Sequence, residues 1–379
     1  MKVHLKGLNG IRAIAAMAVV CSHIGLSLPE FGFSWSLSSD LAANGVSMFF
    51  SLSGFLITYL LLLERDRFKV ISIKNFYIRR VLRIWPLYYF FVLLCIVALL
   101  NFAPSQLSPA LWFYFFLSAN VPFAFGFAIP VLTHYWSLGV EEQFYLFWPW
   151  IVRRSQSLLK WLLIAFGVFM IMKVACRYVD ATTAYHWPYQ VMHTFRFDCM
   201  MIGAMGAVLY FNNNKSFFRI LCSIPAQVAA WLAILLMVLN KFHIASITDA
   251  ELVAVITVVL IVNLSSNPKT LINLEKPLFD FLGKISYGIY VYHPLIIFLV
   301  VKTANQIISN LNPTARLIVL YTSIPALTIL TAYLSYELFE KQLLRLKTKY
   351  SSVHSSDTLT DDKTEIAGVF PVAVKGQNQ

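Results

Sequence analysis

Charged residues are scarce in this sequence. Asp, Glu, Lys and Arg make up 13% of its 379 residues, whereas a soluble globular domain carries about 25%. This scarcity excludes a soluble multidomain enzyme and a disordered chain. Hydrophobic residues reach 59% and the mean hydropathy is +0.69, so the composition favours a polytopic helical membrane protein.

Cysteine is also rare, and no two cysteines have the Cys-x-x-Cys spacing. The chain has five, namely Cys21, Cys95, Cys176, Cys199 and Cys222. We therefore expect no disulfide framework and no metal site. The first apolar run is followed by Leu28, Pro29 and Glu30 and lacks the small residues of a cleavage site. We expect this first segment to be retained.

Apolar runs long enough to cross a bilayer recur along the chain, since a spanning helix needs about 20 such residues. The sequence predicts an all-α fold of ten spans near residues 10–28, 44–63, 84–101, 132–152, 160–177, 194–211, 219–239, 249–266, 283–301 and 316–337. A further apolar segment, 108–129, is interrupted by proline and glycine. We interpret it as re-entrant or interfacial.

The basic residues indicate the orientation. The net charge is +12, and 24 of the 30 Lys and Arg residues lie in six short segments between spans or at the chain ends. This is a topology pattern and not a nucleic-acid footprint, and it predicts that both termini are cytoplasmic. Residues 1–346 would form one integral-membrane domain, and 347–379 a disordered cytoplasmic tail rich in Ser, Thr and Asp. We see no fixed-period repeat and expect no second globular domain.

The first predicted span carries Arg12 and His23, eleven residues apart. Eleven residues complete about three helical turns, so both side chains share one face, about 16 Å apart along the axis. The pair predicts either a polar path through the membrane or a snorkelling arginine and a core histidine. A further histidine, His293, precedes Pro294. A lone histidine beside a helix-kinking proline is more often structural, so it carries little weight.

Two adjacent carboxylates, Glu141 and Glu142, lie near the middle of the span 132–152, with His134 near its outer end. They point about 100° apart on a helix, so at most one faces a given pocket. One glutamate could pair with an arginine from another span. Two in mid-span indicate a polar cavity.

Arg196 and Asp198 lie at the outer start of another span. They indicate either a structural ion pair or a polar entrance. Gly203 and Gly206 follow them and predict close helix packing, as does Gly54 in the second span.

Arg80 and Arg83 lie in a basic cluster before the third span. They are three residues apart and so share a helix face. The cluster could serve as a topology signal, contact anionic lipids or clamp a phosphate.

Seven motifs together resemble the membrane acyltransferase family 3, over about residues 7–346. They are LNGIRAIAAMAVVCSHIG, GVSMFFSLSGFLIT, RRVLRIWPLYY, THYWSLGVEEQFYLFWP, FRFDCMMIGA, LGKISYGIYVYHPL and SYELFEK. The family's Arg and His pattern in the first span matches Arg12 and His23. Its Arg-x-x-Arg pattern matches Arg80 and Arg83, and its acidic signature matches Glu141 and Glu142.

Three positions depart from the family pattern. Asn9 and Ser47 stand where the family usually has Asp, and Ala13 stands where it often has Gly. These departures leave the roles of neighbouring polar residues open. Some relatives carry a hydrolase-like domain after the membrane part, and we expect none here.

The resemblance implies transfer of an acyl group, most commonly acetyl, from cytoplasmic acyl-CoA to a hydroxyl of a cell-surface glycan, in the bacterial inner membrane. His23 would act as general base, or form an acyl-histidine. Glu142 or Glu141 would orient the imidazole or bind the sugar. The remaining candidate residues are Arg12, Arg80 and Arg83 for the donor, and Arg196, Asp198 and His134 for the acceptor.

Other interpretations stay open. The polar cluster would also suit a transporter or flippase of a glycan or lipid-linked intermediate, although no inverted repeat is evident. A scaffold of a polysaccharide assembly complex would tolerate replacement of His23 and Arg12. Acyl-CoA would be a co-substrate, with no permanently bound cofactor and no nucleic-acid partner; membrane lipids would surround the protein. Lipopolysaccharide O-antigen, exopolysaccharide, capsule and small glycosylated acceptors remain alternatives, as does any oligomeric state.

Overall fold

The computed structural model describes residues 2–3, 5–36, 40–350 and 354–355. Its regular structure is helical apart from one parallel pair of two-residue strands, β1 (Lys2–Val3) and β2 (His354–Ser355). The predicted all-α class is therefore confirmed. Most of the tail expected for residues 347–379 lies outside the described residues.

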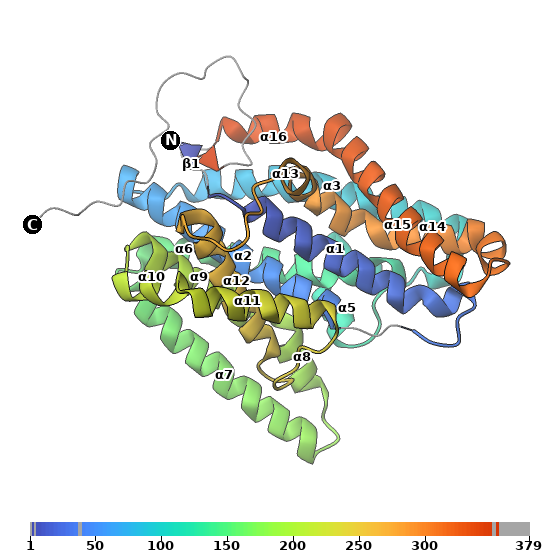
Figure 1. The fold of residues 1–379 in the computed structure, drawn as a ribbon, viewed down its shortest axis with the longest axis horizontal. Coiled ribbons are helices and arrows are strands. Elements are labelled where there is room, and N and C mark those ends of the chain that lie inside the picture. Colours follow the sequence, from blue (N-terminus) through green and yellow to red (C-terminus); the bar gives the residue numbers. More distant parts are fainter. Residues whose placement is uncertain (1, 4, 37–39, 351–353, 356–379) are drawn as a thin grey trace, which may run out of the picture.

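Helices follow one another with short connections. In chain order they are α1 (Leu8–Ser27), η1 (Leu28–Phe31), α2 (Leu41–Phe68), α3 (Ile73–Phe102), η2 (Pro104–Gln106), α4 (Leu111–Phe115), α5 (Asn120–Ala124), η3 (Pro130–Tyr135), α6 (Trp136–Arg154), α7 (Leu158–Thr182), α8 (Trp187–Phe195), α9 (Phe197–Phe211), α10 (Lys215–Leu221), α11 (Ile224–Val238), α12 (Asp249–Ser266), α13 (Pro277–Lys284), α14 (Ser286–Ser309), α15 (Pro313–Ser335), η4 (Tyr336–Glu340) and α16 (Lys341–Thr348). In Figure 1, α1 lies in the middle of the bundle and α7 along one edge.

The helices make this a multi-pass membrane protein. Within the described residues, eight helical stretches are long and apolar enough to span a bilayer, and a ninth is added if α10 and α11, bent by 54°, form one span. The predicted span that this count leaves out, 132–152, coincides with α6, a 19-residue helix that carries two glutamates and two arginines and is therefore more polar than the other spans. The number ten and the cytoplasmic position of both termini stay predictions.

The segment predicted to be re-entrant or interfacial contains only two short helices, α4 and α5, joined by turns. Asn120 of α5 exchanges two hydrogen bonds with Gln143 of α6, with N–O distances of 3.1 and 2.9 Å. The segment is therefore held against α6 and forms no membrane-length helix, as the interrupting proline and glycine predict.

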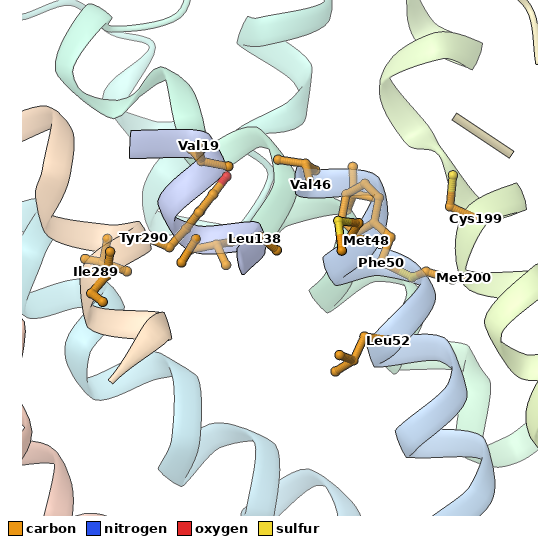
Figure 2. Packing of buried hydrophobic residues seen from close by; sticks show 14 of the residues in the cluster. Val19, Val46, Met48, Phe50, Leu52, Leu138, Cys199, Met200, Ile289 and Tyr290 are labelled. Carbon is orange, nitrogen blue, oxygen red and sulfur yellow. The ribbon is translucent and has the colours of Figure 1, made fainter. Parts of the chain in front are cut away.

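Glycines bring α2 and α9 into close contact. A Cβ atom built on Gly203 would lie 2.0 Å from the carbonyl oxygen of Ser51, and one on Gly54 would lie 2.1 Å from that of Met200. These distances confirm the close packing expected there, since a side chain larger than that of glycine would keep the two backbones further apart. Figure 2 shows Phe50 of α2 beside Met200 of α9 in the same interface.

Candidate functional site

One cavity, which we call the inner cavity, gathers four of the predicted site residues. Arg12 of α1, Arg80 and Arg83 of α3, and Glu141 of α6 all line it, and its volume is about 100 Å³. These residues come from three helices that are separated in the sequence. Three guanidinium groups and one carboxylate give the lining of the cavity an excess of positive charge, which is the kind of surrounding that favours an anion.

Arg80 is the member of this cluster with unused hydrogen-bonding capacity. Its guanidinium lies over the rings of Phe76 and Tyr145, at 5.7 and 5.6 Å from their centroids. Its Nε atom is buried and has no hydrogen-bond partner among the described residues. An unmade hydrogen bond at a buried charged donor is costly, so an anionic ligand would stabilise this position.

Arg12 is held by Asn9, one of the three residues that depart from the family pattern. Its Nη1 donates a hydrogen bond of 3.1 Å to Oδ1 of Asn9, and Nδ2 of Asn9 donates one of 2.7 Å to Oδ1 of Asp280 on α13. The amide at position 9 thus accepts from the arginine and donates to a carboxylate, which an Asp could not do.

The two adjacent glutamates face different surroundings. Oε1 of Glu141 accepts a hydrogen bond of 2.8 Å from Ser53, and the side chain lines the inner cavity. Oε2 of Glu142 accepts one of 2.8 Å from Nε1 of Trp85 and its side chain does not line this cavity. The structure therefore places Glu141 in the cavity. Neither carboxylate forms a hydrogen bond with His23.

A second and larger cavity, the outer cavity, contains the predicted acceptor-side residues His134 and Arg196 together with His23. Its volume is about 760 Å³, which is within the range of small-molecule sites. Its wall also includes charged and aromatic side chains, among them Glu30, Lys302, Phe123, Trp136 and Phe298. The rings of Phe123 and Trp136 stack with centroids 5.0 Å apart.

Three histidines meet at the wall of the outer cavity. Nδ1 of the half-buried His23 lies 2.7 Å from Nε2 of His293, and Nδ1 of His293 lies 2.8 Å from the carbonyl oxygen of Tyr290. The ring of His134 lies 5.4 Å from that of His293, and both of its nitrogens are buried without a hydrogen-bond partner within the described segments. The sequence did not predict His293 as a site residue, because it contains no signal that α14 packs against α1.

Arg196 lies at the junction of α8 and α9, in the left-handed region at a φ of 41°. Its Nη1 donates hydrogen bonds to the carbonyl of Ala43, at 3.0 Å, and to Oγ of Ser47, at 2.9 Å. Its guanidinium also lies 5.6 Å from the ring centroid of Trp136. Arg196 therefore ties α2 to this junction while forming part of the wall of the outer cavity.

Asp198 does not occupy the predicted acceptor entrance. It is fully buried and lines neither cavity; its Oδ2 lies 3.2 Å from Nζ of Lys173. The same Nζ lies 2.5 Å from Oε1 of Glu251. The alternative of a structural ion pair is therefore the better description, with Lys173 of α7 as the partner and not Arg196.

The two cavities share a wall. Val46 of α2 and Tyr290 of α14 line both of them. The hydroxyl of Tyr290 donates to the carbonyl of His134 at 2.8 Å and lies 2.6 Å from Oγ of Ser137. Figure 2 shows the Tyr290 side chain extending from α14 towards Val19 of α1. An arginine-rich chamber and a histidine-lined chamber thus adjoin at one tyrosine.

Arginines that line one cavity and histidines that line the adjoining one are parts expected of a membrane-embedded group-transfer enzyme. Residues 5–336 match the model of a protein family that is described as an acyltransferase domain. The chain belongs to this family, the membrane acyltransferase family 3 that its motifs resemble.

Curated relatives are O-acetyltransferases. The peptidoglycan O-acetyltransferase OatA of Listeria monocytogenes is 28% identical over 317 residues, which cover 76% of this chain and 49% of the relative. The O-acetyltransferase OatA of Staphylococcus aureus is 34% identical over 159 residues, 39% of this chain and 25% of the relative. The chain thus spans about half or less of the relatives it matches. No solved structure matches it.

Proposed function

We propose that this protein transfers an acyl group, favoured to be acetyl, from cytoplasmic acyl-CoA to a hydroxyl of a cell-surface glycan. The observation that carries the proposal is the pair of cavities that share Tyr290 as a wall, with Arg12, Arg80 and Arg83 on one side and His23 on the other. The family and its O-acetyltransferase relatives support acyl transfer over the transporter alternative.

The donor would enter from the side that the basic segments predict to be cytoplasmic. Arg80 and Arg83 would bind phosphate oxygens of CoA, which guanidinium groups hold in bidentate fashion. Arg12 lines the same cavity from α1 and would hold the donor near the wall. The thioester at the end of the flexible pantetheine arm would then reach Tyr290, which also lines the outer cavity together with His23.

The reaction needs a base on the acceptor side. Nε2 of His23 would take the proton of the acceptor hydroxyl while its oxygen attacks the thioester carbonyl. The new C–O bond would form, the C–S bond would break, and the proton would pass to the departing CoA sulfur. A positioned base typically contributes 10²–10⁴-fold to the rate. An acyl-histidine formed at the same Nε2 atom remains the covalent alternative.

The acceptor would occupy the outer cavity. The stacked rings of Phe123 and Trp136 offer an apolar face to a sugar ring, and Arg196, Lys302, Glu30 and His134 supply polar contacts. The Listeria relative is named for peptidoglycan, which joins lipopolysaccharide and exopolysaccharide among the glycans to be tested. We place the protein in the bacterial inner membrane with both termini cytoplasmic.

The test uses purified full-length protein with labelled acetyl-CoA and a panel of cell-surface glycans. The wild-type protein is expected to release CoA and label the glycan, and His23→Ala is expected to abolish both. His186→Ala serves as the matched control, because this exposed histidine lines neither cavity. Transfer by His23→Ala at the wild-type rate would refute the assignment. Glycan movement across the membrane without CoA release would establish the transporter instead.

A further inference from the structure

His293 is close to the proposed base without reaching the cavity. It is fully buried and does not line the outer cavity, yet its Nε2 lies 2.7 Å from Nδ1 of His23. Its other nitrogen lies 2.8 Å from the carbonyl oxygen of Tyr290. The hydrogen bond that connects His293 to the cavity is therefore the one to the ring of His23.

The carbonyl fixes where the protons lie. A carbonyl oxygen only accepts hydrogen bonds, so Nδ1 of His293 must carry the hydrogen that it receives. A neutral imidazole has one N–H, which leaves Nε2 of His293 as an acceptor. Nδ1 of His23 must then donate to it, and the remaining nitrogen, Nε2 of His23, keeps its lone pair.

We propose that His293 is a positioning residue that holds His23 in the tautomer with a proton on Nδ1 and a free lone pair on Nε2. Nε2 of His23 has no hydrogen-bond partner in the part of the chain that the structure describes, and the side chain lines the outer cavity. The lone pair is therefore available to a hydroxyl there. This inference rests on the proposed role of His23 as base.

His293 would also stabilise the charge that forms on His23. When Nε2 of His23 takes the hydroxyl proton, the ring becomes an imidazolium, and its Nδ1–H bond to His293 becomes charge-assisted. His293 neither gains nor loses a proton in this step. The proton on Nε2 of His23 then passes to the CoA sulfur, which restores the starting tautomer. The arrangement is analogous to a carboxylate behind a catalytic histidine, with a carbonyl-anchored imidazole in its place.

The tautomer can be measured directly on the wild-type protein. Nitrogen-15 NMR of histidine-labelled protein distinguishes protonated from bare ring nitrogens, and couplings to ring carbons separate Nδ1 from Nε2. The signals that disappear in His23→Ala identify His23. A protonated Nδ1 and a bare Nε2 are expected. The opposite tautomer would overturn the proposal, whatever the behaviour of any His293 variant.

Kinetics test the consequence. His293→Leu is expected to lower kcat about 100-fold, the low end of what a positioned base contributes, with the KM for acetyl-CoA unchanged. His293→Gln, whose Oε1 can accept from Nδ1 of His23, should recover at least tenfold of that loss. Equal loss in both variants, or a loss confined to KM, would contradict a positioning role.

The two hypotheses fail differently. If His293→Leu retains wild-type kcat while His23→Ala is inactive, the base assignment stands and the positioning role falls. If His23→Ala itself transfers at the wild-type rate, the base assignment falls and the positioning role falls with it, whereas the proposed function falls only if the wild-type protein shows no transfer.

Discussion

Oγ of Ser53 on α2 donates a hydrogen bond of 2.8 Å to Oε1 of Glu141 on α6. In the same rotation of α6, Glu141 lines the inner cavity and Glu142 accepts a hydrogen bond from Trp85 on α3. Glu141 is thereby the carboxylate that faces Arg12, Arg80 and Arg83. Neutralising Glu141 and neutralising Glu142 should therefore have different effects on activity.

Glu141→Gln is expected to reduce kcat/KM for acetyl-CoA at least tenfold, because it removes the negative charge that balances and orients three guanidinium groups. Glu142→Gln is the matched variant: its amide oxygen can still accept from Trp85, so we expect a smaller loss. Both substitutions preserve volume and remove one charge. A larger loss in Glu142→Gln than in Glu141→Gln would show that the wrong carboxylate has been placed at the donor.

Arg80→Ala and Arg83→Ala are expected to raise the KM for acetyl-CoA by about 10- to 100-fold, since each removes a charge-assisted contact to phosphate. Acetyl-pantetheine, which has the thioester but no nucleotide phosphates, provides the decisive comparison. Its KM should be nearly the same in wild type and in both variants. Arg153→Ala, an exposed arginine near the end of α6, controls for general loss of surface charge. A parallel rise for both donors would contradict a phosphate clamp.

Helical periodicity predicted those features of the arrangement that involve residues of a single helix. The relation between Arg12 and His23 depends only on 3.6 residues per turn, and both residues line cavities. The close approach at Gly203 likewise follows from the absence of a side chain. These features are local, so the sequence contains the information directly.

Features that depend on the rotation and crossing of helices could not be predicted. His23 and His293 are 270 positions apart, and their contact requires a particular packing of α1 on α14. The choice between Glu141 and Glu142 needs the rotation of α6. Asp198 pairs with Lys173 and not with the nearby Arg196, because α7 brings a lysine to α9. Each outcome depends on tertiary packing between segments whose individual patterns allow several partners.

The ion-pair group of Lys173, Asp198 and Glu251 predicts a stability effect. Lys173→Ala would leave two carboxylates buried without a counter-charge, and losing one partner of such a group typically costs about 3–5 kcal/mol. A marked loss of thermal stability in detergent is expected. The triple variant Lys173→Met, Asp198→Asn, Glu251→Gln, which removes every charge, should recover much of it. If Lys173→Ala instead abolished activity at unchanged stability, the group would belong to the reaction.

Gly203 and Gly167 form a matched pair for the packing of α2 against α9. A Cβ on Gly203 would lie 2.0 Å from the carbonyl oxygen of Ser51, whereas one on Gly167 of α7 would meet nothing within 4 Å. Gly203→Ala should therefore lower the unfolding temperature, because the two backbones must separate. Gly167→Ala should leave it unchanged or raise it, since alanine favours a helix over glycine by about 1 kcal/mol. Equal effects at both positions would contradict the close contact.

Tyr290 should control coupling between donor and acceptor, because its side chain is part of the wall between the cavities. In Tyr290→Ala the ring is lost, the chambers can join, and water from the outer cavity gains access to the thioester. We expect acetyl-CoA hydrolysis without acceptor to rise several-fold relative to glycan transfer.

Tyr290→Phe separates the ring from its hydroxyl. It keeps the barrier but loses the hydrogen bonds to His134 and Ser137, so the hydrolysis-to-transfer ratio should stay near that of wild type. The backbone carbonyl of Tyr290 accepts the hydrogen bond from Nδ1 of His293 and is present in both variants. Neither substitution should therefore change the tautomer of His293 or of His23. An unchanged ratio in Tyr290→Ala would mean that the side chain does not separate the chambers, and that the donor reaches His23 by another route.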